Sequence, residues 1–289
     1  MKHIVGFSGG ADFQACAGWV LDHFPKDDVI LCNSDAGGNE HPLTTEHIQW
    51  YSENVHPVVI IMPLVRDLGG AGARSNAVKE RRESLGGDDQ PLTFADLAYI
   101  KGRFPSRKAQ FCTEYLKLIP QKRWLAENIP QSESYTRYVG VRADESEFRK
   151  NLPERQWDDY FDCELVRPIK DYTKAMVFEY IKSRGEKVNP LYTLGFGRVG
   201  CAPCINSNKE DILNWATRFP EMIDKVRKWE KQVGNTFFPP NIVPGKVICW
   251  VDEVVAWSKT SHGGKKIPLP FFQAEAESGS CVSKYGLCE

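Results

Sequence analysis

The sequence of 289 residues contains no long apolar run, which excludes a membrane-spanning helix of about 20 apolar residues. It also lacks an excess of charge of one sign: 37 Lys and Arg stand against 38 Asp and Glu, so the formal net charge is −1. A globally basic nucleic-acid-binding protein is therefore excluded, and contact with nucleic acid would depend on a local patch. The N-terminus has no apolar segment of the secretory type. We therefore expect a cytoplasmic protein without a membrane partner.

The composition that remains is that of a globular protein with a sizeable core. Hydrophobic residues make up 42% of the chain and charged residues 26%. Nine cysteines are more than packing requires. In a reducing compartment, such a number indicates metal binding or catalysis rather than a disulfide framework, and the spacing of the cysteines must decide.

A glycine motif directly follows the first apolar segment, residues 4–7, which predicts a buried strand. The motif consists of Ser8, Gly9, Gly10, Ala11 and Asp12. A helical pattern comes next, so backbone N–H groups and the helix N-terminus are set to surround phosphate oxygens. No Lys follows the glycines, so this is not the loop of P-loop NTPases. The alternative is a plain strand–helix turn that uses glycine for its geometry.

Further apolar strands alternate with helical patterns, and this alternation predicts a parallel sheet covered on both faces. Residues 29–32 form the second strand, a helix spans residues 44–54, and residues 58–62 form the third strand. Ligands of such sheets bind beyond the carboxyl ends of the strands. Asp35 and Gly37 follow the second strand there. We therefore expect them to share one site with the glycine motif.

Two charged residues follow a later strand, residues 138–141. Arg142 is suited to bidentate recognition of phosphate or sulfate, and Glu145 is placed to hold it or to assist with a metal. The alternative is an ordinary surface ion pair. Between these strands, residues 66–105 predict a charged loop with a helix at 94–101, either a mobile flap or a solvated surface.

The cysteine spacing predicts a metal centre. Cys201 and Cys204 form a Cys-x-x-Cys motif, and Cys281 with Cys288 forms a looser pair. Two such pairs make a four-thiolate site for tetrahedral zinc or an iron–sulfur cluster. A redox dithiol and a tail stapled by zinc without chemistry are the alternatives. The remaining cysteines in apolar contexts are best explained as core residues: Cys16, Cys32, Cys163 and Cys249.

Five motifs, taken in order, resemble the phosphoadenosine phosphosulfate (PAPS) reductase family. They are Ser8-Gly9-Gly10-Ala11-Asp12, Asp35-Ala36-Gly37, Cys112-Thr113 with Leu116-Lys117 and Pro120, Gly140-Val141-Arg142 with Glu145-Ser146, and Asn189-Pro190-Leu191-Tyr192 leading to Gly200-Cys201-Ala202-Pro203-Cys204. The first motif is similar to the pyrophosphate loop (PP-loop) of the adenine nucleotide α-hydrolase-like enzymes, although Phe13 stands where Ser is usual.

The resemblance implies an α/β fold with a doubly wound parallel sheet of the PP-loop type and a helical, cysteine-bearing C-terminal region. We expect residues 1–195 to form the PP-loop adenine-nucleotide-binding domain. Residues 196–289 would then form the helical C-terminal region with the cysteine metal or cluster site.

The resemblance also implies roles for single residues. The cofactor-binding group holds the phosphates, the adenosine or a metal-bound water, and comprises Ser8, Gly9, Gly10, Ala11, Asp12, Asp35 and Gly37. Asp12 helps to place Mg²⁺, Lys117 and Arg142 stabilise charge on the transferred group, and Glu145 completes the catalytic set.

Cys112 becomes a fifth candidate metal ligand beside the two cysteine pairs, because cluster-bearing family members use a cysteine at this motif. The resemblance favours a 4Fe–4S cluster over Zn²⁺, whereas the spacing permits both.

The C-terminus decides which chemistry within the family we expect. True sulfonucleotide reductases carry a Glu-Cys-Gly-x-His segment, whereas this chain ends in Tyr285-Gly286-Leu287-Cys288-Glu289. The layout is more similar to ATP-cleaving relatives such as the sulfurtransferases of DNA phosphorothioation. It implies an enzyme that releases pyrophosphate from ATP during sulfur transfer, with a cysteine desulfurase or thioredoxin-like donor and a nucleic acid as one candidate acceptor.

Two other interpretations remain open. One is a divergent reductase that takes adenylyl sulfate or its 3′-phosphorylated form, attacks it with Cys281 or Cys288, and produces sulfite. The other is a non-catalytic nucleotide- or zinc-binding module, in which Phe13 marks a disabled loop.

Overall fold

The computed structural model describes residues 1–69, 79–80 and 83–261. Cys281 and Cys288 lie outside the described residues, and so do residues 70–78 and 81–82 of the charged loop expected within residues 66–105. No helix among the residues that the structure describes is long and apolar enough to cross a bilayer.

A six-stranded sheet forms the centre of the fold, with the strand order β3-β2-β1-β4-β6-β5. The strands are β1 (Lys2–Gly6), β2 (Val29–Ser34), β3 (Val58–Ile61), β4 (Tyr135–Tyr138), β5 (Arg155–Asp158) and β6 (Cys163–Val166). All neighbours pair in parallel except β5, which runs antiparallel to β6 at the edge. The α/β fold predicted from the alternating pattern is confirmed, and the antiparallel edge strand is an addition to it.

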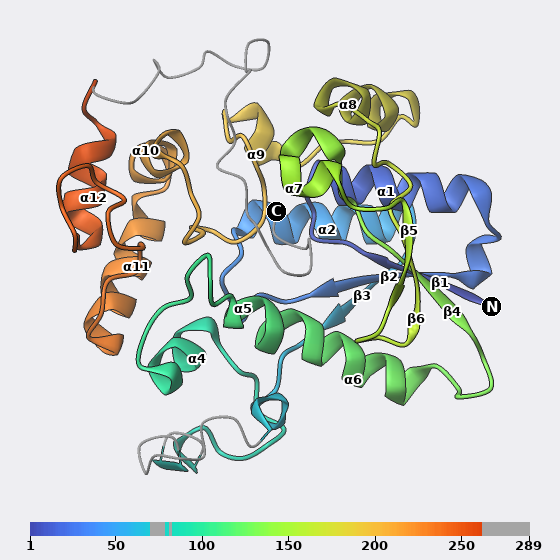
Figure 1. The fold of residues 1–289 in the computed structure, drawn as a ribbon, viewed down its shortest axis with the longest axis horizontal. Coiled ribbons are helices and arrows are strands. Elements are labelled where there is room, and N and C mark those ends of the chain that lie inside the picture. The colour runs from blue at the N-terminus through green and yellow to red at the C-terminus, as the bar shows by residue number, and fades with distance from the viewer. Residues whose placement is uncertain (70–78, 81–82, 262–289) are drawn as a thin grey trace.

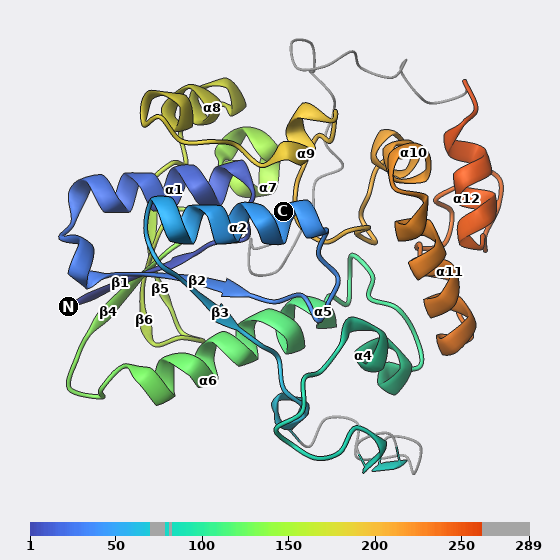
Figure 2. The ribbon, with the colours of Figure 1, turned by 180° about the vertical axis from the view of Figure 1, so that it is seen from behind.

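Helices cover both faces of this sheet (Figures 1 and 2). One face carries α1 (Ala11–His23), α2 (Pro42–Asn54) and α8 (Lys174–Ser183), and the other carries α6 (Ile119–Asn128). On β1, Val5 packs into the core beneath α1, and its neighbour Ile4 packs into the core beneath α6. Because successive side chains of a strand point to opposite faces, burial on both sides requires the continuous apolar run seen in the sequence.

The remaining helices are short or lie beyond the sheet. They are α4 (Phe94–Lys101), α5 (Phe111–Thr113), α7 (Glu147–Lys150), α9 (Pro190–Thr193), α10 (Lys209–Arg218), α11 (Pro220–Val233) and α12 (Val251–Ser258). The amphipathic stretch over residues 211–233 forms two helices, because Pro220 cannot continue the first and instead begins the second. The predicted helical C-terminal region is thus present as far as residue 261.

A single helical run, from α5 through α6, contains a π-helical segment, η3 (Glu114–Leu118). Pro120 has no N–H to donate to the preceding turn, so the regular α-helical hydrogen bonding is already interrupted there. Single π-helical turns occur frequently at functional sites. This one carries Lys117.

Short 3₁₀ turns complete the described elements. They are η1 (Lys26–Asp28), η2 (Val65–Leu68) and η4 (Ala143–Glu145).

Candidate functional site

The predicted motifs meet at the carboxyl edge of the sheet. Strand β1 lies between β2 and β4 and is parallel to both. Ser8 follows β1, Asp35 follows β2, and Arg142 follows β4. Parallel neighbours end at the same edge, so three motifs that are far apart in the chain come together there.

Glycine at position 9 is required by the space around the phosphate-loop candidate. Gly9 has a φ of +77°, and a Cβ there would lie 2.9 Å from Cγ2 of Thr44. Gly10 forms the N-cap of α1 without a side-chain cap. The loop is therefore a tight backbone turn that leads into a helix of 13 residues, as an anion site requires.

Two residues of the Asn-Pro-Leu-Tyr motif hold this loop. Asn189 donates from Nδ2 to the carbonyl oxygen of Gly9 at 3.2 Å. The Ala11 N–H donates to the Tyr192 hydroxyl oxygen at 2.9 Å, so a phenol stands where we expected a phosphate oxygen. The motif was identified in the sequence, but its two contacts with the loop were not predicted.

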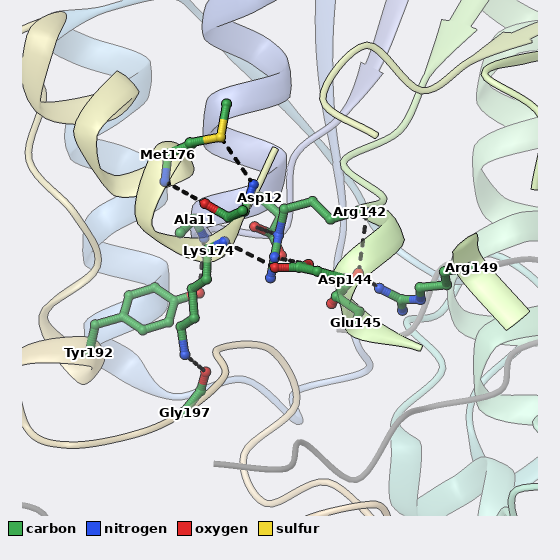
Figure 3. A network of polar contacts seen from close by, with 11 residues as sticks. Ala11, Asp12, Arg142, Asp144, Glu145, Arg149, Lys174, Met176, Tyr192 and Gly197 are labelled. Carbon is green, nitrogen blue, oxygen red and sulfur yellow. Dashed lines mark hydrogen bonds and ion pairs between the residues drawn. The ribbon is translucent and has the colours of Figure 1, made fainter. Parts of the chain in front are cut away.

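Asp12 and Arg142 form a buried ion pair, with 2.6 Å between Oδ1 and Nε. Figure 3 shows the network around this pair. Arg142 also pairs with Asp144, and its backbone N–H donates to Oε2 of Glu145 at 3.4 Å. Glu145 forms its ion pair with the guanidinium of Arg149 instead. The structure therefore unites Asp12 with Arg142, and Glu145 supports Arg142 through the backbone.

Gly140 allows this close approach of the Arg142 segment to α1. A Cβ at position 140 would lie 2.5 Å from both the carbonyl carbon and the carbonyl oxygen of Asp12. Any side chain there would push the two motifs apart.

Lys174 is a further cation that the sequence did not single out. It is the first residue of α8, and its Nζ donates to the carbonyl oxygen of Gly197 at 2.9 Å (Figure 3). Although the residue as a whole is exposed, desolvation of its ammonium group lowers the pKa of Lys174, and the nearby Asp12 opposes this effect. It links the carboxyl edge of the sheet to the segment that precedes Cys201.

Three of the predicted metal ligands line one cavity together with Lys117. The cavity is lined by Ala36, Phe94, Gln110, Cys112, Thr113, Leu116, Lys117, Cys201, Cys204, Ile205 and Asn206. Burial raises the pKa of Cys201 to about 11, and the ammonium group of Lys117 opposes that rise. Ala36 belongs to the motif after β2, so this cavity adjoins the carboxyl edge of the sheet.

The donor set of this cavity suits a thiolate-bound group, but it is incomplete. In residues 1–69, 79–80 and 83–261, no group of three or more His, Cys, Asp or Glu side chains could hold a metal ion. An iron–sulfur cluster takes four thiolates and is larger than one ion. The cavity presents three thiols, and the two candidates for the fourth lie outside the described residues.

A short segment after β2 joins the carboxyl edge of the sheet to the Cys-x-x-Cys turn. Its last residue, Glu40, pairs with Cys201 in an isolated antiparallel bridge. Burial raises the pKa of Glu40 to about 7, with Lys117 opposing the rise and Asp35 adding to it. Three charged groups of the candidate site are therefore close enough to influence one another.

The other described cysteines are buried in the core, as the sequence indicated: Cys16, Cys32, Cys163 and Cys249. Burial raises the pKa of Cys32 to about 12 and that of Cys163 to about 11. These thiols are inert packing groups.

Comparison with known proteins identifies relatives of this chain. Residues 89–207 match the model of the phosphoadenosine phosphosulfate reductase domain. An uncharacterized 37.8 kDa protein of Escherichia phage 186 is 31% identical over 336 aligned positions, which cover 99% of this chain and 96% of that protein. The chain belongs to the phosphoadenosine phosphosulfate reductase family, as its motifs predicted.

Characterised relatives match over shorter segments. The adenosine 5′-phosphosulfate reductase of Allochromatium vinosum is 38% identical over 100 residues, and that of Streptomyces coelicolor is 42% identical over 66 residues. These alignments cover 35% and 23% of this chain, and only 36% and 28% of the two reductases. Among solved structures, the PAPS reductase of Candida auris in complex with phosphate aligns with 70% of this chain and 81% of its own, at 16% identity and a TM-score of 0.46.

The family match covers one part of the candidate site. Cys112, Lys117, Arg142 and the Cys201–Cys204 turn lie within residues 89–207, whereas the glycine motif and Asp35 precede them.

Proposed function

We propose that this protein is an adenine-nucleotide-dependent sulfurtransferase that cleaves ATP with release of pyrophosphate and works with an iron–sulfur cluster. The observation that carries the proposal is the cavity lined by Cys112, Cys201, Cys204 and Lys117, which adjoins the motif after β2. Thiols next to a nucleotide edge are the arrangement that nucleotide-driven sulfur chemistry needs. Zinc remains the alternative metal for these thiols.

In this proposal, backbone N–H groups and charged side chains form the part of the site that binds the nucleotide. The loop after β1 and the N-terminus of α1 receive the phosphates, with Ser8 supplying a hydroxyl. Asp12 fixes the direction of Arg142, and the same carboxylate would hold Mg²⁺ shared with the phosphates. Arg142 and Lys117 then stabilise the negative charge that develops on the transferred group.

The reaction needs little covalent work from the chain. An acceptor oxygen attacks the α-phosphorus of ATP and pyrophosphate leaves, after which a sulfur nucleophile displaces AMP from the adenylated acceptor. The contribution of the residues is positioning and electrostatic stabilisation. A cluster held by Cys112, Cys201, Cys204 and a fourth thiolate supplies electrons or a coordination site for sulfur when it is bound.

A sulfonucleotide reductase is the second candidate, favoured by the segments that are 38% and 42% identical to adenosine 5′-phosphosulfate reductases. In that case the same edge would bind adenylyl sulfate, and a thiolate from Cys281 or Cys288 would attack its sulfur atom and displace AMP, giving an S-sulfocysteine. Two external thiols would then release sulfite from it and become a disulfide.

One preparation separates these functions. The protein is purified without oxygen, its iron and zinc are measured, and it is given ATP or adenylyl sulfate. About four irons per chain with pyrophosphate release from ATP would support sulfur transfer. Sulfite formation from adenylyl sulfate with added thiol would make the protein a reductase. A colourless protein with one zinc and no nucleotide binding would refute both.

Cysteine variants test whether the cavity thiols hold the metal. Cys112→Ala should lose most of the bound iron and its visible absorption, because it removes one cavity thiolate. Cys249→Ala is the matched control, since this buried cysteine belongs to the same helical core but does not line the cavity. Equal iron content in the two variants would remove Cys112 from the ligand set.

A further inference from the structure

The segment from Asp35 to Glu40, which we call the bracket, is fixed at its nucleotide end. The Asp35 N–H donates to the carbonyl oxygen of Ile61 at 3.0 Å, and the Asp35 carboxylate accepts from the Gly38 N–H at 2.9 Å. The carbonyl oxygen of Gly37 accepts from the Phe94 N–H at 2.9 Å. The bracket is therefore anchored to β3 and to α4 before it reaches the thiols.

The other end of the bracket holds the Cys-Ala-Pro-Cys turn. Asn39 is 1% exposed, and it contacts both residues that separate the two cysteines. Its carbonyl oxygen accepts from the Ala202 N–H at 2.9 Å, and its Nδ2 donates to the carbonyl oxygen of Pro203 at 3.2 Å. Asn39 thus binds the turn twice, once through the Asn39 backbone and once through the Asn39 side chain.

The turn's own hydrogen bonds do not join it to the sheet. The Cys204 N–H donates to the Ser207 hydroxyl oxygen at 3.2 Å, and the Ser207 N–H donates back to the Cys204 carbonyl oxygen at 3.0 Å. Both contacts are local and leave the direction of the turn unspecified. The contacts from Asn39, together with the bridge between Glu40 and Cys201, set that direction relative to the nucleotide edge.

We propose that Asn39 is a positioning residue that holds the thiols of Cys201 and Cys204 at a fixed place beside the nucleotide-binding edge. The inference rests on the proposed function, in which these thiols act next to a bound nucleotide. Groups that the fold already holds in the reactive orientation react faster, because the entropy of orienting them is lost during folding and not during the reaction. Asn39 does this through the backbone of Ala202 and Pro203, the two residues between the cysteines.

The test compares Asn39→Ala with Asn33→Ala in the full chain. Asn33 is the matched control: it is also buried, at 3% exposed, and its Nδ2 also donates to a backbone carbonyl, that of Phe7, at 2.8 Å. The measurement is the rate at which iodoacetamide alkylates Cys201 and Cys204 in reduced, metal-free protein, followed by mass spectrometry. Asn39→Asp keeps the size of the side chain and removes the donor, so it serves if the Ala variant fails to fold.

Asn39→Ala and Asn39→Asp should raise the alkylation rate of the two thiols about three- to tenfold, as expected for the loss of one buried hydrogen bond. Asn33→Ala should leave that rate at the wild-type value. Iron release to a chelator, measured on anaerobically purified protein, should accelerate in the same variants. Unchanged alkylation in both Asn39 variants would overturn the proposal. If the wild-type protein holds no iron, the proposed cluster fails, but the alkylation rates still decide the role of Asn39.

Discussion

Oδ1 of Asp12 accepts a hydrogen bond from Nε of Arg142 at 2.6 Å, although 130 positions separate the two residues in the chain. The pair joins the glycine loop after β1 to the segment after β4, on neighbouring strands of the sheet. It makes the two sides of the proposed phosphate site one electrostatic unit.

The first prediction concerns this pair. Arg142→Ala should lower the free energy of unfolding by about 3 kcal/mol, because it leaves the buried carboxylate of Asp12 without its partner. Asp12→Ala should have a similar cost, and the double variant should cost much less than the sum. Urea unfolding of the four proteins measures the coupling. Strictly additive losses would show that the pair contributes no interaction energy.

The second prediction concerns Tyr192, whose hydroxyl oxygen accepts the hydrogen bond of the Ala11 N–H. Tyr192→Phe removes the acceptor that a phosphate oxygen must displace, so nucleotide should bind about three- to tenfold more tightly. Calorimetric titration with ATP and with adenylyl sulfate measures this. Tyr180→Phe is the control, because that hydroxyl donates to Asp22 at 2.7 Å near the C-terminal end of α1, whereas Ala11 is the first residue of that helix. Weaker binding by Tyr192→Phe would mean that the phenol itself contacts the nucleotide.

The third prediction uses two adjacent glycines of the bracket. Both have positive φ, +68° at Gly37 and +72° at Gly38. A Cβ at Gly37 would lie 2.5 Å from the Phe94 nitrogen, whereas a Cβ at Gly38 would meet nothing within 4 Å. Gly38→Ala should therefore cost only the backbone strain of about 1 kcal/mol, and Gly37→Ala about 3 kcal/mol or more. Thermal unfolding measures both, and equal losses would contradict the close contact of the bracket with α4.

The fourth prediction is an acid sensitivity caused by His47. This residue is buried on α2 with Nε2 3.1 Å from Oε1 of Gln14, and burial lowers the pKa of His47 to about 4. The unfolded chain takes up the proton at its ordinary value of about 6.5, so between these values the unfolded state binds more protons. Stability is therefore lost as the pH falls through this window, by about 2 kcal/mol between pH 7 and pH 5.

The matched variants for this prediction are His47→Gln and His23→Gln. The first should reduce the difference in urea stability between pH 7 and pH 5 by the amount above. The second replaces an exposed histidine at the end of α1 and should keep the acid sensitivity of the wild-type protein. An unchanged difference in His47→Gln would assign the acid sensitivity to other groups.

Much of the fold could be predicted because its signals are local. The helix predicted over residues 94–101 is observed as α4 with the same bounds. Thr93 caps it through its side chain, and Gly102 ends it with a left-handed backbone. The meeting of the motifs after β1 and β2 was predicted from one rule about parallel strands. That the segment after β4 joins them was not predicted from the strand pattern.

Strand β4 shows where local signals mislead. The strand was expected over the apolar residues 138–141, but it spans Tyr135–Tyr138. It contains Arg137, which is 4% exposed, pairs with Asp158 at 2.6 Å and stacks on the ring of Phe161 at 3.4 Å. The charge is neutralised by partners that are distant in the sequence, so the pattern alone does not reveal a buried strand. The partner Asp158 lies on β5, a polar edge strand that was missed for a similar reason.

The contacts of the candidate site could not be read from the sequence, since they join residues far apart in the chain. Asn39 and Lys174 belong to none of the motifs, so nothing in the sequence indicates their contacts with Pro203 and Gly197. Tyr192 and Ala11 lie in two separate motifs, but neither motif reveals that the two residues are in contact. Cys112 was named only through the family resemblance, and the cavity that it shares with Cys201 and Cys204 gives that choice a spatial basis.

The helices that follow residue 195 share their hydrophobic core with residues that precede it. Trp215 and Val226 belong to the same buried cluster as Leu97 and Phe111, and α11 packs on α4. The domain boundary that the sequence led us to expect at residue 195 stays a prediction. A chain cut there should yield two fragments with matching apolar faces, each poorly soluble alone, that reassemble into a working protein when they are produced together.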